Sequence, residues 1–429
     1  MINQELSATI DAIWRIESAR VIARVARLTH DLSLAEDYAQ DALLTALEVW
    51  PAKGLPDNPG AWLMTAAKRR ALDYLRHQTM AASKHVEFAR ELDTHCAFTE
   101  QAFAERIDAS LDGDVDDDIL RLIFTACHPV LSPDARAALT LKVVGGLTTQ
   151  EIARAYLKSE PTIAQRIVRA KRTLAEAHVP FEMPRGAELA PRLASVLEVV
   201  YLFFNEGYAA TSGNHWTRPE LCDEALRLGR VLASLMPQEA EVHGLSALME
   251  IQASRLPARA DAQGHPILLP DQDRGHWDRI LIQRGLAALA GAESLPGALG
   301  PYTLQAAIAA CHARAATYEE TNWPQIAALY EALAQMAPSP VVALNRAVAV
   351  GMAFGPAAGL ELVDALLGEP TLAHYHLLPS VRGDLLARLD RIQEARTEFE
   401  RAAALTCNGR ERAFLLARAA VCTKKPGQP

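Results

Sequence analysis

The chain lacks the sequence patterns that mark zinc sites, disulfide frameworks and membrane spans. Its six cysteines are scattered and never form a C-x-x-C pair, so we expect no metal site and no disulfides, as in a reducing cytosol. No stretch approaches the roughly 18 apolar residues of a membrane span, and the first residues lack a signal-peptide pattern. We therefore expect a cytoplasmic protein with no membrane contact. Aromatic residues make up only 6%, whereas half of the residues are hydrophobic, and the abundance of Ala and Leu predicts an all-α protein.

The net charge of −9 comes from one segment of the chain. Residues 91–120 carry ten carboxylates against a single arginine, and the remaining residues balance. The run LDGDVDDD lies in this segment and is typical of a solvated, partly disordered linker, which we place at residues 91–118. The acidic balance of the whole chain therefore does not exclude nucleic-acid binding by another part of it. Such a linker could also compete with DNA for a basic helix.

Residues 147–177 predict two short helices joined by a tight turn. Thr148 and Glu151 have the spacing of a capping box, and Ser159 followed by Pro161 predicts the start of the second helix. Apolar residues of the second helix follow a 4-3-4 spacing on one stripe: Ile163, Ile167, Ala170 and Leu174. The other side is polar and basic: Thr162, Gln165, Arg166, Arg169 and Arg172. This is the pattern of a helix-turn-helix that reads the major groove, although an amphipathic pair with a solvated basic face has it too.

Residues 1–90 predict a helical module with one acidic helix. Ser33 and Glu36 have the spacing of a capping box for the helix AEDYAQDALLTALEVW. Its expected core face is Ala39, Leu43, Ala46 and Trp50. Another face carries Asp37, Asp41, Leu44 and Glu48. This second face is either solvated, which is the commoner case, or a docking surface for a basic protein.

A third helix is expected to begin after the break PAKGLPDNPG, with Asn58 as its cap and Pro59 as its first residue. Trp62 shares one stripe of this helix with Arg69, Asp73 and Arg76. An aromatic ring beside cations suits single-stranded or melting DNA, where bases stack on rings and phosphates meet positive charge. A core position for Trp62 is the equally weighted alternative.

These segments resemble a known family. AEDYAQDALLTALEVW followed by NPGAWLMTAAKRRALDYLRH resembles region 2 of the extracytoplasmic-function (ECF) sigma factors of bacterial RNA polymerase. LSPDARAALTLKVVGGLTTQEIARAYLKSEPTIAQRIVRAKRTLAEA resembles their region 4. The resemblance covers residues 10–180 and departs from the family at the turn YLKSEP, where a small residue or glycine is usual. It implies region 2 at residues 1–90 and region 4 at residues 119–180.

The resemblance also implies partners and roles by position. The partners are core RNA polymerase, through its β′ clamp helices and β flap, and promoter DNA; no cofactor is implied, and the chain itself is not an enzyme. The face that docks on the clamp helices is Asp37, Gln40, Asp41 and Leu44. The −10 element is bound by Trp62, Arg69, Arg70, Asp73 and Arg76. The −35 element is bound by Thr162, Gln165, Arg166, Arg169 and Arg172. We expect Arg166→Ala or Arg169→Ala to weaken −35 binding with little loss of polymerase affinity, and Asp41→Arg to do the reverse.

Residues 186–295 predict a further helical domain that an ordinary member of the family does not need. Its loop GYAATSGNHWTRP gathers polar and aromatic groups: Asn205, Glu206, His215, Trp216 and Arg218. Mutual hydrogen bonding among such groups is favoured over a small-molecule or protein-binding pocket. A second irregular stretch carries His265, Asp271, Asp273, His276 and Trp277, but their spacing matches no standard metal site. An enzyme in this domain is disfavoured because no nucleophile–base pair or phosphate loop is present.

Residues 296–422 carry a weak repeat of a small or apolar residue four places before an aromatic or Leu. The pairs are Ile326/Tyr330, Ala358/Leu362 and Ala395/Phe399. Their intervals of 32 and 37 residues bracket the roughly 34-residue period of TPR helix pairs. We therefore expect a TPR-like α-solenoid, with a plain α-bundle as the alternative.

Regions 2 and 4 followed by such an extension resemble one subgroup of the ECF sigma factors. In that subgroup the extension is thought to replace a dedicated anti-sigma factor, which implies that it contacts the sigma regions or the polymerase and gates activity. Neighbouring genes of the subgroup often encode small YCII-related proteins, so a link with such a protein is implied. The rival interpretation is a stand-alone helix-turn-helix regulator with a TPR sensor. The acidic face and the Trp62 helix disfavour it, because a plain repressor needs neither.

Overall fold

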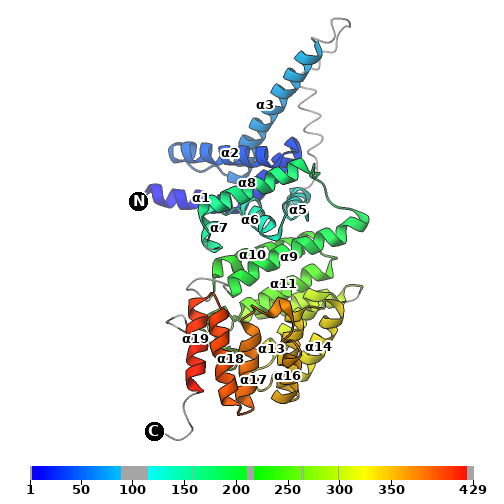
Figure 1. The fold of residues 1–429 in the computed structure, drawn as a ribbon. Helices are drawn as coiled ribbons and strands as arrows, with labels where there is room; N and C mark the ends of the chain where they lie inside the picture. The colour runs from blue at the N-terminus through cyan, green and yellow to red at the C-terminus, as the bar shows by residue number, and fades with distance from the viewer. Residues whose placement is uncertain are drawn as a thin grey trace. The chain divides into compact units, whose positions relative to one another are not determined.

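The structure is a computed structural model, and it describes residues 2–87, 115–156, 158–209, 217–261, 263, 265–297 and 299–422. These residues form α-helices and short 3-10 turns, with no β-strand among them and one isolated bridge between Ala260 and Pro266. Within the same ranges no helix is long and apolar enough to cross a membrane. The chain divides into two compact units, Met1–Val199 and Val200–Pro429 (Figure 1). The expected all-α class is confirmed.

The first unit contains a three-helix module followed by a second group of helices. The three-helix module is α1 (Ile2–Thr29), α2 (Leu32–Lys53) and α3 (Pro59–Glu87). The second group is α5 (Val115–Ala126), α6 (Pro133–Val143), α7 (Thr149–Ala155) and α8 (Glu160–Glu176). A 3-10 turn, Gly186–Glu188, leads into α9 (Leu189–Tyr208), which contains the division between the two units.

The three-helix module packs closely because the buried face of α2 consists largely of alanine. Four alanines of this face are fully buried: Ala35, Ala39, Ala42 and Ala46. Side chains this small let α1 and α3 approach the backbone of α2, since packing distance depends on the residues at the contact. Trp50 closes the end of this face and is 2% exposed. The predicted core face of this helix is thus largely confirmed, with Leu43 half-buried.

The predicted capping box of Ser33 and Glu36 is wrong. Asp31 is the N-cap of α2, and its carboxylate accepts hydrogen bonds from the backbone N–H groups of Ser33 at 2.7 Å and Leu34 at 3.1 Å. Glu36 is buried and lies instead beside two lysines of the second helix group. An aspartate two residues upstream satisfies the free N–H groups of the first turn. Glu36 therefore does not cap α2 and instead forms long-range ion pairs with Lys142 and Lys171, which local spacing does not reveal.

The helix starts of the helix-turn-helix are confirmed. The backbone N–H of Thr148 donates to Glu151 at 2.8 Å, and the N–H of Glu151 donates to the Thr148 hydroxyl at 3.1 Å. Ser159 caps α8 by accepting from the N–H of Thr162. The four apolar residues of the predicted stripe of α8 are all buried. The turn between α7 and α8 includes Leu157, which lies outside the described residues.

The acidic linker falls mostly outside the described residues, but its expected end differs from the structure. Helix α5 already begins at Val115, so Asp117 and Asp118 lie in its first turn. The side chain of Asp118 is fully buried between α5 and α1, where it pairs with Arg24 and Arg27. A charge run in sequence therefore ends in a buried ion cluster.

The second unit continues from the second half of α9 into a series of helices. These are α10 (Pro219–Leu235), α11 (Ala240–Ala253), α12 (Arg279–Ser294), α13 (Pro301–Arg314), α14 (Trp323–Met336), α15 (Pro340–Ala353), α16 (Pro356–Asp364), α17 (Leu377–Arg388), α18 (Ile392–Leu405) and α19 (Gly409–Val421). Short 3-10 turns lie at Leu256–Ala258, Leu269–Asp271, Arg274–His276 and Pro370–Leu372. From α13 onward each helix packs on the next one along the chain, and α15 and α17 also touch.

The three repeat pairs differ in how deeply they are buried. Ala395 and Phe399 are buried in α18, and Ile326 is buried in α14. In α16 the register differs by one residue, because Gly359 and Leu360 are buried while Ala358 is only partly so. A Cβ built on Gly359 would lie 2.7 Å from the Cα of Gly351. Helices α15 and α16 therefore touch backbone to backbone, which a glycine permits and an alanine would not.

The structure describes only some residues of the two polar clusters predicted in the extension. Glu206 pairs with Arg218, in line with the expectation that these groups satisfy one another. His215 and Trp216 lie outside the described residues. His265 pairs with Asp261 and His276 pairs with Asp273, and no group of three metal-ligating side chains occurs in the described ranges.

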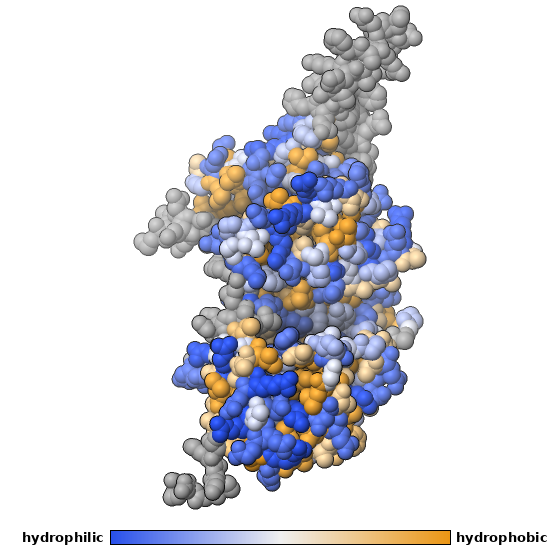
Figure 2. All heavy atoms as spheres, viewed as in Figure 1, coloured by the Kyte–Doolittle hydropathy of each residue, from blue (hydrophilic) through white to orange (hydrophobic). Residues whose placement is uncertain are grey.

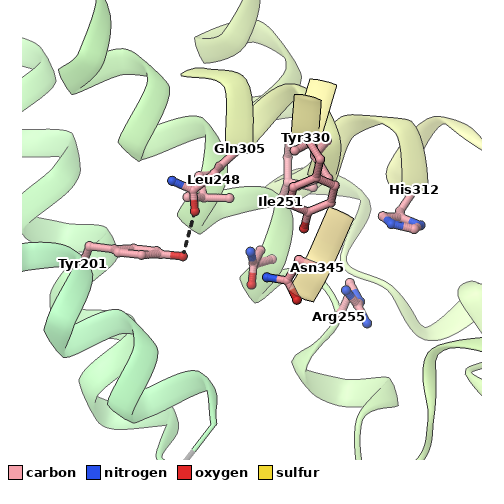
Figure 3. Close-up of a pocket in the computed structure, with 11 residues that line it drawn as sticks. Tyr201, Leu248, Ile251, Arg255, Gln305, His312, Tyr330 and Asn345 are labelled. Carbon is pink, nitrogen blue, oxygen red and sulfur yellow. Dashed lines mark hydrogen bonds between the residues drawn. The ribbon is translucent and has the colours of Figure 1, made fainter. Parts of the chain in front are cut away.

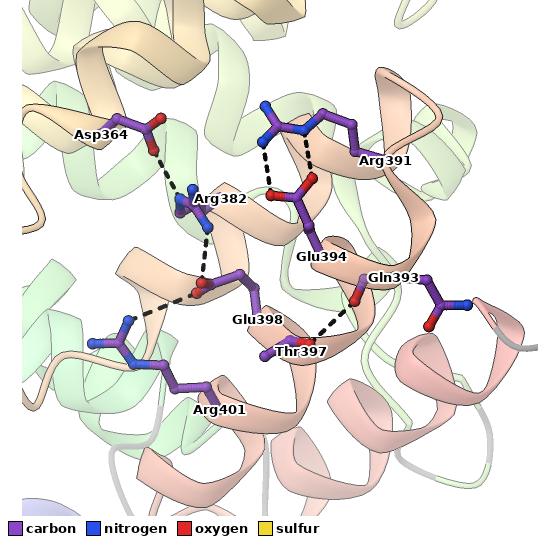
Figure 4. Close-up of polar contacts among 8 residues, drawn as sticks. All are labelled: Asp364, Arg382, Arg391, Gln393, Glu394, Thr397, Glu398 and Arg401. Carbon is purple, nitrogen blue, oxygen red and sulfur yellow. Dashed lines mark hydrogen bonds and ion pairs between the residues drawn. The ribbon is translucent and has the colours of Figure 1, made fainter.

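Arg382 links three successive helices of the second unit (Figure 4). Its guanidinium contacts Asp364 of α16 at 2.8 Å and Glu398 of α18 at 2.9 Å. Glu398 is nearly buried, and its other cation, Arg401, lies 3.8 Å away. We expect Arg382→Met to lower the free energy of unfolding by about 3 kcal/mol, because it leaves a buried carboxylate without its main partner. Chemical denaturation of the full chain measures this.

Arg391→Met is the matched control for that prediction. Arg391 also pairs with a glutamate, Glu394 at 2.7 Å, but both side chains are about half exposed. Exposed ion pairs contribute little because water and salt screen them. An equal loss of stability in the two variants would mean that burial of the Arg382 cluster does not determine its contribution.

Candidate nucleic-acid and protein interface

Helix α8 exposes the basic face that the sequence predicted. Thr162, Gln165, Arg169 and Arg172 are exposed, and Arg166 is partly so. Arg166 contacts Asp134 at 3.2 Å and Arg172 contacts Glu176 at 2.7 Å. Arg169 has no hydrogen bond or ion pair to another described residue, so its guanidinium is available to an external anion. The buried stripe on the opposite side holds the helix in place while this face stays open to solvent.

A groove lies beside this face. It encloses about 380 Å³ and lies between α8 and the segment from Val130 to Ala135 that opens α6. Thr162, Gln165, Arg166 and Arg169 line its α8 side. The groove is therefore lined by the side chains that the sequence assigned to DNA.

The acidic face of α2 is also exposed. Asp37, Gln40 and Leu44 are exposed, and Leu44 retains 58% of its accessible surface. Leu47 lies one turn further along and is also exposed, and apolar surface over α2 is visible in Figure 2. Burial raises the pKa of Tyr38, and Tyr74 and the carboxylates of Asp37 and Asp41 add to the shift. An exposed leucine surrounded by carboxylates is typical of a surface that binds a partner with a basic and apolar face.

The Trp62 helix, α3, combines a structural and an exposed part. The ring of Trp62 is half-buried and packs edge-on against Trp50, with 5.4 Å between ring centroids and 68° between planes. Arg69 and Asp73 are exposed, and Arg76 contacts Asp73 at 3.3 Å. Trp62 thus has a packing partner and still keeps part of its ring accessible.

The structure brings together two residues that the sequence assigned to different sites. Arg70 of the −10 set contacts Asp41 of the polymerase set at 2.6 Å and the hydroxyl of Thr45 at 3.3 Å. Both charged side chains are nearly half exposed. A pair of this kind contributes only about 0–1 kcal/mol, so a partner can displace either member at low cost. Asp41→Arg would place two arginines together, which makes it a poor test of docking alone.

Ion pairs join the three-helix module to the helix-turn-helix, and those of Glu36 are largely buried. Glu36 of α2 contacts Lys171 of α8 at 2.7 Å and Lys142 of α6 at 3.6 Å. Glu151 of α7 pairs with Arg15 of α1. Local spacing picked out Glu36 and Glu151 only as capping residues and did not reveal these long-range pairs, but Lys142 carried a signal, since it interrupts the otherwise apolar run LTLKVV. A charge within such a run often has a buried partner.

The beginning of α9 is bonded to the helix-turn-helix group. The Arg192 guanidinium donates to the carbonyl oxygen of Phe124 at 2.7 Å, and the Ser195 hydroxyl donates to that of Cys127 at 2.6 Å. Arg136 of α6 contacts Ser195 and lies 3.0 Å from Glu198. These contacts are largely buried and leave the basic face of α8 uncovered.

Three family models match separate parts of the chain. Sigma-70 region 2 matches residues 15–80, and Sigma-70 region 4 matches residues 121–174. A family of unknown function (DUF6596) matches residues 192–293. The first two cover α2, α3 and α8, which carry the three candidate surfaces.

Relatives were found over nearly the whole chain and over less than half of it. An uncharacterized protein (R00370) of Rhizobium meliloti is 44% identical over 414 residues, which cover 94% of this chain and 95% of the relative. The probable ECF RNA polymerase sigma factor SigI of Mycobacterium tuberculosis is 25% identical, over 40% of this chain and 56% of its own length. The ECF RNA polymerase sigma factor SigK of Mycobacterium bovis is 29% identical, over 36% of this chain and 78% of its own length.

No solved structure matched the chain. The two sigma-70 regions occur in the family's order, with an exposed basic helix in the second and an exposed acidic helix in the first. The chain therefore carries the sigma-70 regions 2 and 4, its relatives include ECF RNA polymerase sigma factors, and a long helical extension follows the two regions.

Proposed function

We propose that this protein is a sigma factor that docks on core RNA polymerase through α2, reads the −35 element with α8 and opens the −10 element with α3. The exposed basic face of α8 supports this proposal most strongly, because its apolar stripe is buried and Arg169 has no partner among the described residues. Guanidinium and amide groups at such positions reach base edges and phosphates in the major groove. The protein would act in the cytoplasm, where the polymerase transcribes.

Docking on the polymerase is assigned to the face of Asp37, Gln40, Asp41 and Leu44. The carboxylates supply charge for a basic partner, and Leu44 supplies apolar area at its centre. The expected partner is the clamp-helix segment of the β′ subunit, with the β flap as the partner of region 4. Complementary charge at such a surface chiefly raises the association rate and fixes the orientation of the complex.

Opening of the −10 element is assigned to Trp62, Arg69, Arg70, Asp73 and Arg76. Base stacking on the accessible part of the Trp62 ring, with cations on the phosphates, would stabilise the melted strand. Arg70 is held by Asp41 in the free protein. Docking that engages Asp41 would release Arg70 toward the DNA, which links the two surfaces.

Binding of one promoter by regions 2 and 4 would place α3 and α8 on two separate DNA elements. In the free protein, ion pairs of 2.7 and 3.6 Å join α2 to α8 and α6 through Glu36. We expect these ion pairs to separate if the two regions move apart on the promoter.

Regulation is assigned to the extension. Its first helix, α9, is bonded to region 4 through Arg192 and Ser195, and this helix is the proposed path by which the extension would act on the helix-turn-helix. The helices of residues 296–422 would form a TPR-like surface for a protein partner, and a small YCII-related protein is one candidate. A stand-alone DNA-binding regulator is the alternative function, and it would need no polymerase docking.

Arg169→Ala tests the proposed role of α8 in binding the −35 element. We expect holoenzyme made with this variant to bind a promoter fragment about tenfold to a hundredfold more weakly, since one base or phosphate contact contributes about 1–3 kcal/mol. Its affinity for core polymerase should be unchanged. The measurement is fluorescence anisotropy with a genomic fragment that the wild-type holoenzyme retains, at several salt concentrations. A phosphate contact would lower the salt slope by about one.

Arg185→Ala is the control for that experiment. Arg185 is exposed and lies after α8, so its loss removes the same charge from another place. Equal weakening by the two variants would show that total charge, and not the α8 face, determines binding.

A further inference from the structure

The second unit contains a polar cavity that neither sigma region uses. It encloses about 200 Å³ and is bordered by α9, α11, α13, α14 and α15. Figure 3 shows six side chains that converge on it: Tyr201, Arg255, Gln305, His312, Tyr330 and Asn345. Its volume is below the ~300–1,000 Å³ of pockets for drug-sized ligands. A small metabolite fits this space, whereas a peptide or nucleic acid does not.

Arg255 gives the cavity a positive charge that no carboxylate of the described residues balances. Its Nε donates to the side-chain oxygen of Gln272 at 3.3 Å, and its guanidinium lies 5.3 Å from the centroid of the Trp277 ring. No described Asp or Glu lies within ion-pair distance of it. Burial lowers the pKa of the Arg255 guanidinium. A largely enclosed charge without a counter-ion is costly and is normally paired with an anion.

The neighbouring arginines do not offset this charge. Arg274 donates to the backbone carbonyl oxygens of His312 at 2.6 Å and Ala315 at 2.7 Å. Arg259 lies over the ring of Tyr208, 3.8 Å from its centroid. Both add positive potential around Arg255, so this part of the unit favours negative charge.

The remaining polar groups of the cavity are neutral. Burial, with Arg255 and Arg274 nearby, lowers the pKa of His312 to about 4, so its ring is uncharged at neutral pH. The Nδ1 of that ring is buried and has no hydrogen-bond partner among the described residues. Burial raises the pKa of Tyr330 to about 12, so its hydroxyl stays protonated. Tyr201 donates to Gln305 at 3.3 Å. The lining offers hydrogen bonds around a single cation and contains no carboxylate.

We propose that this cavity binds a small organic anion, a carboxylate or phosphate ester that also carries hydroxyl or amide groups, with Arg255 as its counter-ion. The guanidinium matches the geometry of a carboxylate or phosphate with two parallel hydrogen bonds. The amides of Gln305 and Asn345 and the free Nδ1 of His312 would bind the polar remainder of the ligand. Binding itself does not depend on the function proposed above.

The proposed regulatory step of such a ligand would act through α9, the helix that carries Tyr201. Tyr201 lies on α9, six residues after Ser195, whose hydroxyl is bonded to the second helix group. This regulatory step rests on the proposed function, whereas occupancy of the cavity can be measured without polymerase or DNA. A ligand that binds the cavity without affecting transcription would contradict only the regulatory step, whereas absence of binding would contradict the cavity proposal itself.

Thermal denaturation and titration calorimetry of the full chain test the binding. The probes are inorganic phosphate, glycerol 3-phosphate, malate and glutamate. They compare a phosphate without an organic part, a phosphate ester with hydroxyl groups, and two carboxylates with different polar groups. We expect at least one organic probe to raise the melting temperature and bind the wild-type chain. Arg255→Met should weaken that binding at least about tenfold, the loss of one charge-assisted pair.

Two further variants complete the test. Arg284→Met removes an exposed arginine of α12 and should bind the probe as the wild type does. Asn345→Asp supplies a carboxylate inside the cavity and should weaken probe binding while raising the melting temperature of the free protein, even if Arg255→Met folds poorly. No stabilisation of the wild type by any probe, or equal binding by wild type and Asn345→Asp, would overturn the proposal.

Discussion

Asp118→Asn will lower the free energy of unfolding of the first unit by about 3–5 kcal/mol, the cost of removing one partner from a buried ion cluster. The Asp118 side chain is fully buried and contacts Arg24 at 3.1 Å and Arg27 at 3.4 Å, with Arg121 close by. Burial raises the pKa of Asp118 despite the opposing pull of the three arginines. The cluster is therefore no large net source of stability, but without the carboxylate its cations remain enclosed and uncompensated. Chemical denaturation followed by circular dichroism measures the change.

Asp117→Asn is the matched control for Asp118→Asn. Asp117 is the preceding residue of α5, its side chain is 60% exposed, and its nearest cation, Arg121, lies 3.9 Å away. Because exposed charges are screened by water, its loss should change stability by less than about 1 kcal/mol. Similar losses in the two variants would mean that Asp118 does not hold α5 against α1 in the way the structure indicates.

Asp37→Arg will weaken assembly with core RNA polymerase by about a hundredfold or more. Asp37 is exposed on α2 and has no ion pair with a described residue, so the substitution breaks no internal contact, unlike Asp41→Arg. Reversing a charge inside a complementary interface costs several kcal/mol, since attraction becomes repulsion. The measurement is the affinity of labelled full-length protein for core polymerase, by anisotropy or surface plasmon resonance. The effect should shrink at high salt.

Asp11→Arg controls for the change of net charge. Asp11 is exposed on α1 and lies outside the proposed docking face, so this variant should assemble as the wild type does. If Asp11→Arg and Asp37→Arg weaken assembly equally, the docking face lies elsewhere or docking follows total charge alone.

The sequence predicted most of what is local in this fold. Caps are set by neighbours within four residues, so Thr148 with Glu151, Ser159 and Asn58 were all found at helix starts; the Asn58 side chain accepts from the N–H of Ala61 at 3.0 Å. The exception is α2, where Asp31 caps in place of Ser33. Two candidate caps within three residues cannot be separated by spacing alone, because each can satisfy the same N–H groups.

The long-range ion pairs could not be predicted. Glu36 lies 135 positions from Lys171, and Arg70 lies 29 positions from Asp41, and no periodicity connects them. The helical pattern places Asp41 and Arg70 on exposed faces of different helices, and only packing of α2 against α3 brings them together. Burial of Asp118 was hidden for a related reason, because an acidic run resembles a solvated linker until a helix folds over its last residues.

The cavity of the extension was missed because its lining is assembled from five helices. Its residues run from Tyr201 to Asn345, and each of them alone is unremarkable in the sequence. The irregular stretches that did attract attention gave local pairs, such as His265 with Asp261. Residues that are far apart in the sequence can be recognised as one site only when the three-dimensional structure is known.

Run-off transcription with purified core RNA polymerase tests whether the protein is a sigma factor. The template is DNA upstream of this protein's own and neighbouring genes, and the full-length wild type is compared with core alone, Asp37→Arg and Arg169→Ala. We expect a discrete transcript with the wild type and none with core alone. Both variants should give less transcript, Asp37→Arg through weaker polymerase assembly and Arg169→Ala through weaker promoter binding. No transcript with the wild type, while the full chain alone binds the same DNA, would show that the protein is not a sigma factor and would favour a stand-alone regulator.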